Sequence, residues 1–459
     1  MSELIISVSG LRGIIGETLT PEIAIRYVTS FSAQTIPPGP FVITRDGRAT
    51  GKMLAHAIHA GLNAVGRDTI DAGVAATPTT GVLIRELKAA GGIQISASHN
   101  PSEYNGIKLF SAEGRVIPAV PGAAVLERYK QNQTDWVSHS HVGKQAECEQ
   151  VIDAHLKKVL QTVDVEAIRK RKFKVLLDSN RGAGSLLGEA LLKELGCEIV
   201  LLGGKPDGFF EHIPEPTAEN LSPVFERVKN AHVDVGFCQD PDADRLAVID
   251  QNGRYIGEEY TVALCVEHVL RNHTLRKRAK GPIVMNCSSS RMAQDIAEQY
   301  GVPFFQSPVG EANVVDLILK KEAMFGGEGN GGPIDPVVGL VRDSFVGMAQ
   351  ILDAMCLRNK TIAELADELP RYEIVKQKIT LPQGTTPDRI RAMMDGLEKK
   401  FSDQKCNRQD GLRIDWPQAW ALIRGSNTEP ILRIVAEAKT ESEAMALCDK
   451  IRNNLEISP

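Results

Sequence analysis

The same order of elements occurs three times in the first 332 residues of the chain. Each copy alternates strand, helix, strand, helix and strand, and then ends in a polar loop. Such alternation predicts a largely parallel sheet with helices packed against it. A repeat of this length indicates three related α/β domains instead of a short-period solenoid. The copies span residues 41–105, 173–245 and 282–332.

The remaining residues follow a different pattern. From Glu373 onwards the sequence predicts a strand, a long helix over 387–401, strands at 421–424 and 430–438, and a final helix over 442–456. We therefore expect a smaller α+β domain at the C-terminus. The polar span 131–149 reads as a linker. The expected domains are residues 1–150, 151–252, 253–372 and 373–459.

Composition and charge exclude several classes of protein. The net charge is −5, from 53 basic and 58 acidic residues, which argues against a nucleic-acid partner or a basic membrane-surface protein. No apolar run approaches the ~20 residues of a transmembrane helix, and no basic segment precedes the apolar residues at the N-terminus. The eight cysteines form no Cys-x-x-Cys pair, which is typical of reduced thiols. These features predict a cytoplasmic protein without a membrane partner.

The polar loops follow strands, at the sheet edge where α/β proteins bind ligands. The loop over 327–332 also satisfies Gly-x-Gly-x-x-Gly. A dinucleotide site requires a helix to start within that motif, and Pro333 and Pro336 follow it instead. The glycines are therefore better explained by a turn that approaches a ligand closely.

The first loop contains Ser98 and His99 after a predicted strand, with Lys108 downstream. A serine beside polar groups could serve as a nucleophile, and a nearby lysine as an acid–base group or anion ligand. Taken alone, the serine is better explained by a turn capped by Ser and Asn, and the lysine by a solvated surface position.

The second loop places Asp240, Asp242 and Asp244 at alternate positions. Three close carboxylates repel one another unless a cation lies among them, and hard oxygen ligands suit Mg²⁺ or Ca²⁺. The loop lacks the glycine and the final glutamate of an EF-hand. A solvated acidic turn is the alternative.

The third and fourth loops offer groups that suit a phosphorylated sugar. Glu328 and Asn330 lie among glycines, where a carboxylate and an amide could bind vicinal hydroxyls. The fourth loop could form a phosphate site, because arginine binds phosphate in a bidentate manner and backbone N–H groups add further donors. A flexible turn and a polar hairpin are the alternatives. The candidate phosphate ligands are Arg424, Ser426, Asn427 and Thr428.

Together, in this order, the four loops resemble those of the α-D-phosphohexomutase superfamily, over essentially the whole chain. The resemblance implies three α/β domains with mixed, largely parallel sheets, a smaller C-terminal α+β domain, and an active site in the central cleft. It also implies a serine that carries a phosphoryl group, Ser98, and a Mg²⁺ site formed by this serine and the three aspartates. Glu328 and Asn330 would bind the sugar, and the fourth loop the phosphate that does not react.

The resemblance assigns further residues to the chemistry. Lys108 would be the acid–base group, Arg12 would lie near the phosphoserine, Arg245 would support its surroundings, and His99 is a further candidate. The implied reaction interconverts hexose 1-phosphate and 6-phosphate through a hexose 1,6-bisphosphate, which is both intermediate and activator. The expected partner is a small hexose phosphate, and the expected assembly a monomer or a homodimer.

Two positions depart from the pattern of many relatives. Pro241 stands where many bacterial relatives have glycine, and Gly332 stands where many have histidine. The sugar loop slightly favours a phosphoglucosamine mutase, with a phosphomannomutase or phosphoglucomutase as the alternative. A metal-dependent sugar phosphatase and a catalytically silent sugar-phosphate-binding relative are further hypotheses.

Overall fold

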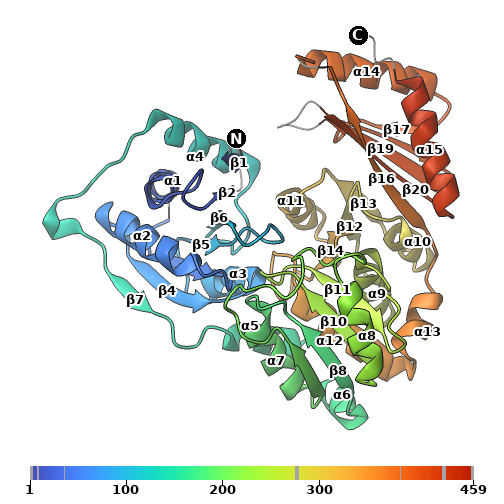
Figure 1. The fold of residues 1–459 in the computed structure, drawn as a ribbon, viewed down its shortest axis with the longest axis horizontal. Helices are drawn as coiled ribbons and strands as arrows, with labels where there is room; N and C mark the ends of the chain where they lie inside the picture. The colour runs from blue at the N-terminus through green and yellow to red at the C-terminus, as the bar shows by residue number, and fades with distance from the viewer. Residues whose placement is uncertain are drawn as a thin grey trace.

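The computed structural model describes residues 4–7, 10–35, 37–273, 279–382, 384–425 and 431–455. Its strands form four sheets of seven, four, four and five strands. Figure 1 shows the first sheet at the left, the second and third close together, and the fourth at the upper right. Among these described residues, no helix is long and apolar enough to cross a bilayer.

The first sheet has the strand order β1-β2-β6-β5-β3-β4-β7. Parallel pairs join β3 to β4 and β5, and β4 to β7, whereas β6, β2 and β1 continue the sheet in antiparallel fashion from β5. Its strands are β1 (Ile5–Ser7), β2 (Gly10–Ile14), β3 (Phe41–Arg45), β4 (Thr69–Val74), β5 (Gly91–Ile95), β6 (Tyr104–Ser111) and β7 (Gln145–Glu147). The helices of this part are α1 (Pro21–Gln34), α2 (Gly51–Ala64), α3 (Thr77–Glu86) and α4 (Ala119–Gln131), followed by the 3₁₀ turn η1 (His139–His141).

The second and third sheets repeat one scheme. Each has two parallel pairs and one antiparallel strand, in the orders β11-β10-β8-β9 and β13-β12-β14-β15. The strands of the second sheet are β8 (Lys174–Asp178), β9 (Glu198–Leu202), β10 (Val235–Gln239) and β11 (Leu246–Asp250). Those of the third are β12 (Ile283–Asn286), β13 (Phe304–Ser307), β14 (Phe325–Glu328) and β15 (Gly332–Ile334).

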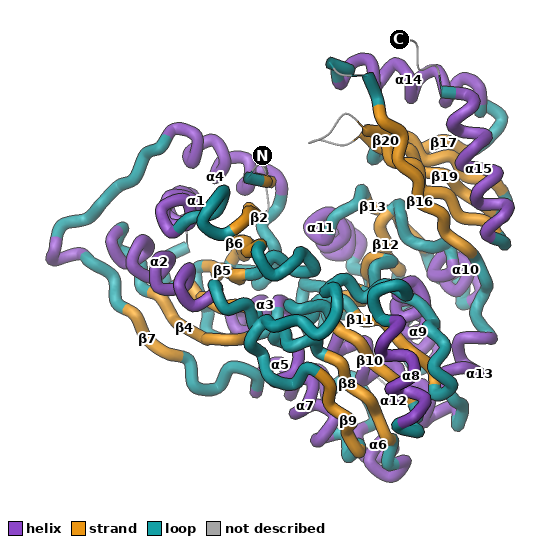
Figure 2. Tube along the Cα trace, viewed as in Figure 1, coloured by secondary structure: helices purple, strands orange, loops and turns teal. Residues whose placement is uncertain are grey.

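Helices flank these two sheets (Figure 2). Four lie within residues 151–252: α5 (Asp153–Leu160), α6 (Val165–Arg171), α7 (Gly184–Glu194) and α8 (Ser222–Asn230). Five lie within the described part of residues 253–372: α9 (Glu258–Arg271), α10 (Met292–Gln299), α11 (Glu311–Lys321), α12 (Ser344–Arg358) and α13 (Ile362–Asp367).

The fourth sheet is antiparallel throughout, in the order β16-β20-β19-β18-β17. This confirms the expected α+β domain, although the sequence pattern missed β17 and β18. Its strands are β16 (Glu373–Thr380), β17 (Lys405–Asn407), β18 (Leu412–Trp416), β19 (Ala419–Gly425) and β20 (Ile431–Ala438). Two helices, α14 (Pro387–Lys400) and α15 (Glu441–Asn454), accompany them.

The span 131–149 is more than a linker, because its end forms β7, which pairs in parallel with β4. The glycine-rich span 326–332 is also only partly a loop. Its two ends belong to β14 and β15, which pair with each other. The strands β7 (Gln-Ala-Glu), β14 (Phe-Gly-Gly-Glu) and β15 (Gly-Pro-Ile) are short and lack the alternation of apolar and polar residues that predicts a strand.

The second and third sheets share one apolar core. Side chains of β8 and β10 and those of β12 and β14 belong to the same buried cluster, which α9 and α12 complete. The first and fourth sheets have separate buried clusters. The boundary expected at residues 252 and 253 lies between β11 and α9. Side chains from both sides of this boundary belong to the shared core.

A buried histidine joins three parts of the chain. Nδ1 of His155, on α5, lies 2.9 Å from Oγ1 of Thr79 on α3, and Nε2 lies 2.7 Å from Oδ2 of Asp343. Asp343 caps α12 by accepting hydrogen bonds from two backbone N–H groups. This network fixes α3, α5 and α12 relative to one another.

We expect the substitution His155→Ala to lower the free energy of unfolding by about 2 kcal/mol, because it leaves buried polar atoms of Thr79 and Asp343 without their partner. Urea titration measures the change. His139→Ala, which alters an exposed histidine, is the matched control. Equal urea midpoints for the two variants would contradict the prediction.

Candidate active site

Each of the first three predicted loops is the turn of a hairpin. It joins the last parallel strand of a sheet to an antiparallel strand that returns beside it: β5 to β6, β10 to β11, and β14 to β15. Ligand sites in α/β sheets lie beyond the carboxyl ends of the parallel strands. The three hairpins therefore place equivalent turns at equivalent edges.

Ser98 is held in a strained and buried turn. Its φ is +50°, in the left-handed region that few non-glycine residues adopt. Its backbone N–H donates to Oγ of Ser96 at 2.8 Å, and that hydroxyl donates to Oδ2 of Asp46 at 2.6 Å. Strain of this kind is found at functional sites when the surroundings fix it.

Arg48 supplies much of that fixation. Its guanidinium group donates to the carbonyl oxygens of Ser98 (2.8 Å) and Asn100 (2.6 Å). It also binds the carbonyls of Pro101 and Tyr104 and pairs with Asp46 at 3.1 Å. The sequence reasoning missed Arg48 and Asp46, although both follow β3, at the same sheet edge as the predicted loops.

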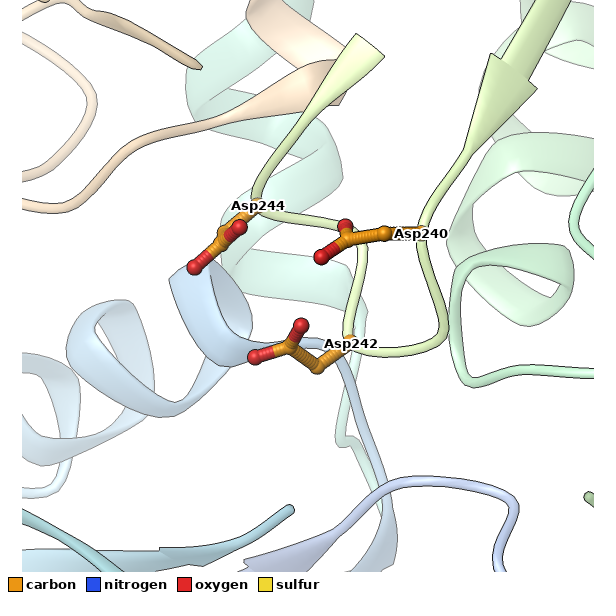
Figure 3. A group of neighbouring side chains, drawn as sticks. All are labelled: Asp240, Asp242 and Asp244. Atoms are coloured by element: carbon orange, nitrogen blue, oxygen red, sulfur yellow. The ribbon is translucent and has the colours of Figure 1, made fainter. Parts of the chain in front are cut away.

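The three aspartates of the second loop lie at a single point. Asp240, Asp242 and Asp244 are fully buried, and one carboxylate oxygen from each lies within 4.8 Å of the others. Figure 3 shows the carboxylates converging from the turn between β10 and β11. Oγ of Ser98 donates to Oδ2 of Asp240 at 2.9 Å. The first and second predicted loops therefore meet in space.

The chemistry of this group fits a hard divalent cation. Oδ1 of Asp242 and Oδ1 of Asp244 are buried and accept no hydrogen bond, which is costly for a charged oxygen. Burial, together with the charges of Asp244 and Asp242, raises the pKa of Asp240 well above its usual range. These oxygens could serve as ligands of a cation, and the charge of the cation would favour the ionised form of all three carboxylates.

Lys108 reaches the same carboxylates from β6. Its Nζ donates to Oδ2 of Asp242 at 2.5 Å and to Oδ2 of Asp244 at 3.2 Å. Burial lowers the pKa of Lys108, but the two aspartates raise it by more, so it lies above its ordinary value. Lys108 is therefore an ammonium group at neutral pH.

Three further predicted residues surround Ser98. Nδ1 of His99 lies 3.3 Å from Oγ of Ser98, and Nη1 of Arg12 donates to Oδ1 of Asn100 at 3.2 Å. Burial lowers the pKa of His99 to about 3, with the charges of Arg245 and Arg12 adding to the effect. The imidazole is consequently neutral at pH 7. Nε of Arg245 lies 3.9 Å from Oδ1 of Asp244.

In the third loop, the carboxylate of Glu328 has hydrogen-bond partners in the protein, whereas the side-chain oxygen of Asn330 has none. Glu328 accepts from Nδ2 of Asn286 at 2.7 Å, from the N–H of Gly310 at 3.1 Å, and from Nη1 of Arg342 at 2.8 Å. Oδ1 of Asn330 is buried and has no hydrogen-bond partner. The structure thus places Glu328 in a network of protein contacts, which the sequence could not show.

A pocket of about 780 Å³ opens beside this loop, between the third and fourth sheets. Glu328, Asn330 and Arg245 line it, together with Glu259 of α9 and Arg433 of β20. Burial raises the pKa of Glu259 to about 8. Because these lining residues are polar or charged, the wall of the pocket is rich in hydrogen-bonding groups, as a binding site for a polar small molecule requires.

Arg424 lies at the end of β19, apart from the cluster around Ser98. Its Nε donates to Oδ1 of Asp410 at 2.9 Å, and Oδ2 of Asp410 accepts from the backbone N–H of Val309 at 2.8 Å. Asp410 thus links Arg424 to the segment whose next residue, Gly310, binds Glu328. The other predicted phosphate ligands, Ser426, Asn427 and Thr428, lie outside the described residues.

The described residues bring most of the predicted groups together. Ser98, Lys108 and the aspartates are in direct contact, and Arg342 links Asp244 to Glu328. Neither Arg342 nor Asp410 belongs to a predicted loop. Both were missed because no local motif marks them, and their partners are distant in sequence.

Comparisons with known proteins agree with this arrangement. Four family profiles match in chain order, described as phosphoglucomutase/phosphomannomutase alpha/beta/alpha domains I, II and III and the C-terminal domain. They match residues 4–135, 153–253, 258–372 and 378–454.

Individual relatives span almost the entire chain. A protein of Thermococcus kodakarensis named phosphoglucomutase/phosphomannomutase is 38% identical, over 95% of this chain and 94% of its own length. A protein of Methanopyrus kandleri named "Probable phosphoglucosamine mutase" is 30% identical, over 96% of this chain and 95% of its own. The crystal structure of a phosphoglucomutase/phosphomannomutase family protein from Burkholderia thailandensis has a TM-score of 0.83 at 25% identity and covers 98% of this chain and 97% of its own. The chain belongs to the phosphoglucomutase/phosphomannomutase family.

Proposed function

We propose that this protein is a phosphohexose mutase that interconverts the 1-phosphate and 6-phosphate of a hexose through a phosphoserine at Ser98. The observation that carries the proposal is the contact between Ser98 and the buried aspartates, 2.9 Å from Oγ to Oδ2 of Asp240. Family membership supports it, and relatives along nearly the full length bear mutase names.

The proposed reaction consists of two phosphoryl transfers. The free hydroxyl of the hexose phosphate attacks the phosphorus of phosphoserine 98, the bond from phosphorus to Oγ breaks, and a hexose 1,6-bisphosphate forms. After the bisphosphate turns around in the site, Oγ attacks the other phosphoryl group and regenerates phosphoserine. In the first transfer the attacking hydroxyl loses a proton, and Oγ of Ser98 gains one as it leaves. In the second transfer Oγ loses this proton, and the departing hexose oxygen gains one.

The residues around Ser98 suit the charge changes of these steps. Phosphoryl transfer depends on positioning and on neutralising negative charge. Asp240, Asp242 and Asp244 would hold Mg²⁺, which supplies positive charge beside the reacting phosphoryl group when it is bound. Lys108, as an ammonium group, is placed to give a proton to the leaving oxygen and to take one from the attacking hydroxyl.

Other side chains would bind the remainder of the substrate. Arg12 and Arg245 add positive charge near Ser98, and His99 supplies a neutral hydrogen-bonding group. In the pocket, Glu328 and Asn330 would bind sugar hydroxyls. Arg424, with Ser426, Asn427 and Thr428, would hold the phosphate that does not react, so that either end of the bisphosphate can face Ser98.

Glucosamine phosphate is the substrate we propose, with mannose and glucose phosphates as the alternatives. The name of the Methanopyrus relative supports the first, and that of the Thermococcus relative supports the others. These sugars differ at C2, so kcat/KM for the three 1-phosphates distinguishes them. The largest value is expected for glucosamine 1-phosphate.

The direct test incubates the protein with Mg²⁺, a trace of hexose 1,6-bisphosphate and a hexose 1-phosphate. Phosphorus NMR should record formation of the 6-phosphate, and Ser98→Ala should reduce the rate by on the order of 10³-fold or more because the acceptor oxygen is lost. Release of inorganic phosphate without isomerisation would instead indicate a phosphatase. Full mutase activity in Ser98→Ala would contradict the mechanism.

We expect Asp410→Asn to raise KM for the hexose phosphate by about 10-fold with a smaller change in kcat. The substitution weakens the ion pair that orients Arg424 and the link to Val309, both of which act in binding. Initial-rate kinetics measure the two constants separately. Asp403→Asn, at an exposed aspartate nearby, is the control, and equal KM values for the two variants would contradict the prediction.

A further inference from the structure

Arg342 lies between the second and third site loops and belongs to neither. Its Nη2 pairs with Oδ2 of Asp244 at 2.7 Å, its Nη1 with Oε2 of Glu328 at 2.8 Å, and its Nε with Oε2 of Glu311 at 2.9 Å. Each guanidinium nitrogen therefore binds a different carboxylate. We infer that Arg342 is a positioning residue that holds the metal loop and the sugar loop in one arrangement, an inference that rests on the proposed function.

The three partners come from separate elements. Asp244 precedes β11, Glu311 begins α11, and Glu328 ends β14. The side chain of Arg342 is only 11% exposed, so these ion pairs are largely protected from water and salt. Only arginine presents three such nitrogens in one rigid plane, whereas lysine offers a single point charge.

Gly332 lacks a side chain at the place where Arg342 lies. A Cβ atom at position 332 would lie 2.4 Å from Cδ, 2.7 Å from Cγ and 2.9 Å from Cβ of Arg342. The φ of Gly332 is not in the left-handed region, so the backbone itself does not require glycine. The arginine side chain occupies the space, and any side chain at 332 would displace it.

This accounts for the departure at Gly332 noted in the sequence. A histidine at 332 and Arg342 in its present position exclude each other. In this chain the space over β15 is filled by an arginine that reaches both loops. Glu328, which would bind the sugar, consequently depends on Arg342 for its orientation, and so does Asp244, which would bind the cation.

Kinetics of two single variants and their double variant test the inference. Arg342→Ala should lower kcat/KM by about 10- to 100-fold and raise the Mg²⁺ concentration for half-maximal activity, since residues that orient metal ligands have effects of this size. Gly332→Ala should shift both quantities in the same direction. The double variant should resemble Arg342→Ala, because both changes disrupt the same ion pairs of Arg342.

Two further measurements separate positioning from a loss of folding. Millimolar guanidinium chloride should raise the activity of Arg342→Ala and should not raise that of Arg115→Ala, which removes a buried arginine that pairs with Asp316. Arg342→Lys keeps the charge and should recover less than half of the wild-type kcat/KM. If Arg342→Ala fails to fold, this lysine variant gives the deciding result, and wild-type constants in it would overturn the inference.

Additive effects of Gly332→Ala and Arg342→Ala would also overturn the inference, as would unchanged KM and Mg²⁺ dependence in Arg342→Ala. A wild-type protein without mutase activity would refute the proposed function alone. In that case calorimetric titration with Mg²⁺, and with glucose 1-phosphate, still tests the coupling. Both affinities should fall in Arg342→Ala, and unchanged affinities would contradict it.

Discussion

The structure depends on one electrostatic constraint: three fully buried carboxylates within 4.8 Å of one another. Such a group is unstable unless positive charge or protons compensate it. Lys108 compensates from the first sheet, and Arg342 reaches Asp244 from the segment after the third. The aspartates of the second sheet therefore draw groups from both neighbours to one point.

The repeated hairpin explains how separate sheets form one site. In each of the first three sheets, an antiparallel strand returns beside the last parallel strand, and the polar turn between them faces the carboxyl edge. The first turn provides Ser98, the second the aspartates and the third Glu328. The fourth sheet is linked to the third hairpin through Asp410, Val309 and Gly310. A reaction that handles both ends of a bisphosphate requires such groups from several directions.

Much of this was predictable from the sequence. The parallel strands are short apolar runs, their helices have apolar periodicity, and the polar turns follow the strands directly. The sequence alone therefore predicts Ser98, Lys108 and the aspartates as candidate site residues. The strands β7 and β17 have three residues each, too few to show a period. By contrast, β18 (Leu-Arg-Ile-Asp-Trp) alternates apolar and polar residues, so it was predictable from the sequence. Arg48, Arg342 and Asp410 were not identified because their roles depend on carbonyls and carboxylates distant in sequence. The sequence showed that Gly332 was unusual, but only the position of Arg342 gives the physical reason.

The central claim is that the buried aspartates bind a divalent cation beside Ser98. Manganese binding, measured by the loss of the free Mn²⁺ signal in electron paramagnetic resonance, tests it most directly without requiring substrate. The account predicts one ion for each chain in the wild type and a large loss of affinity in Asp242→Asn, because Oδ1 of Asp242 is a buried oxygen that accepts no hydrogen bond in the structure. No binding to the wild type, or equal affinity in Asp242→Asn, would contradict it.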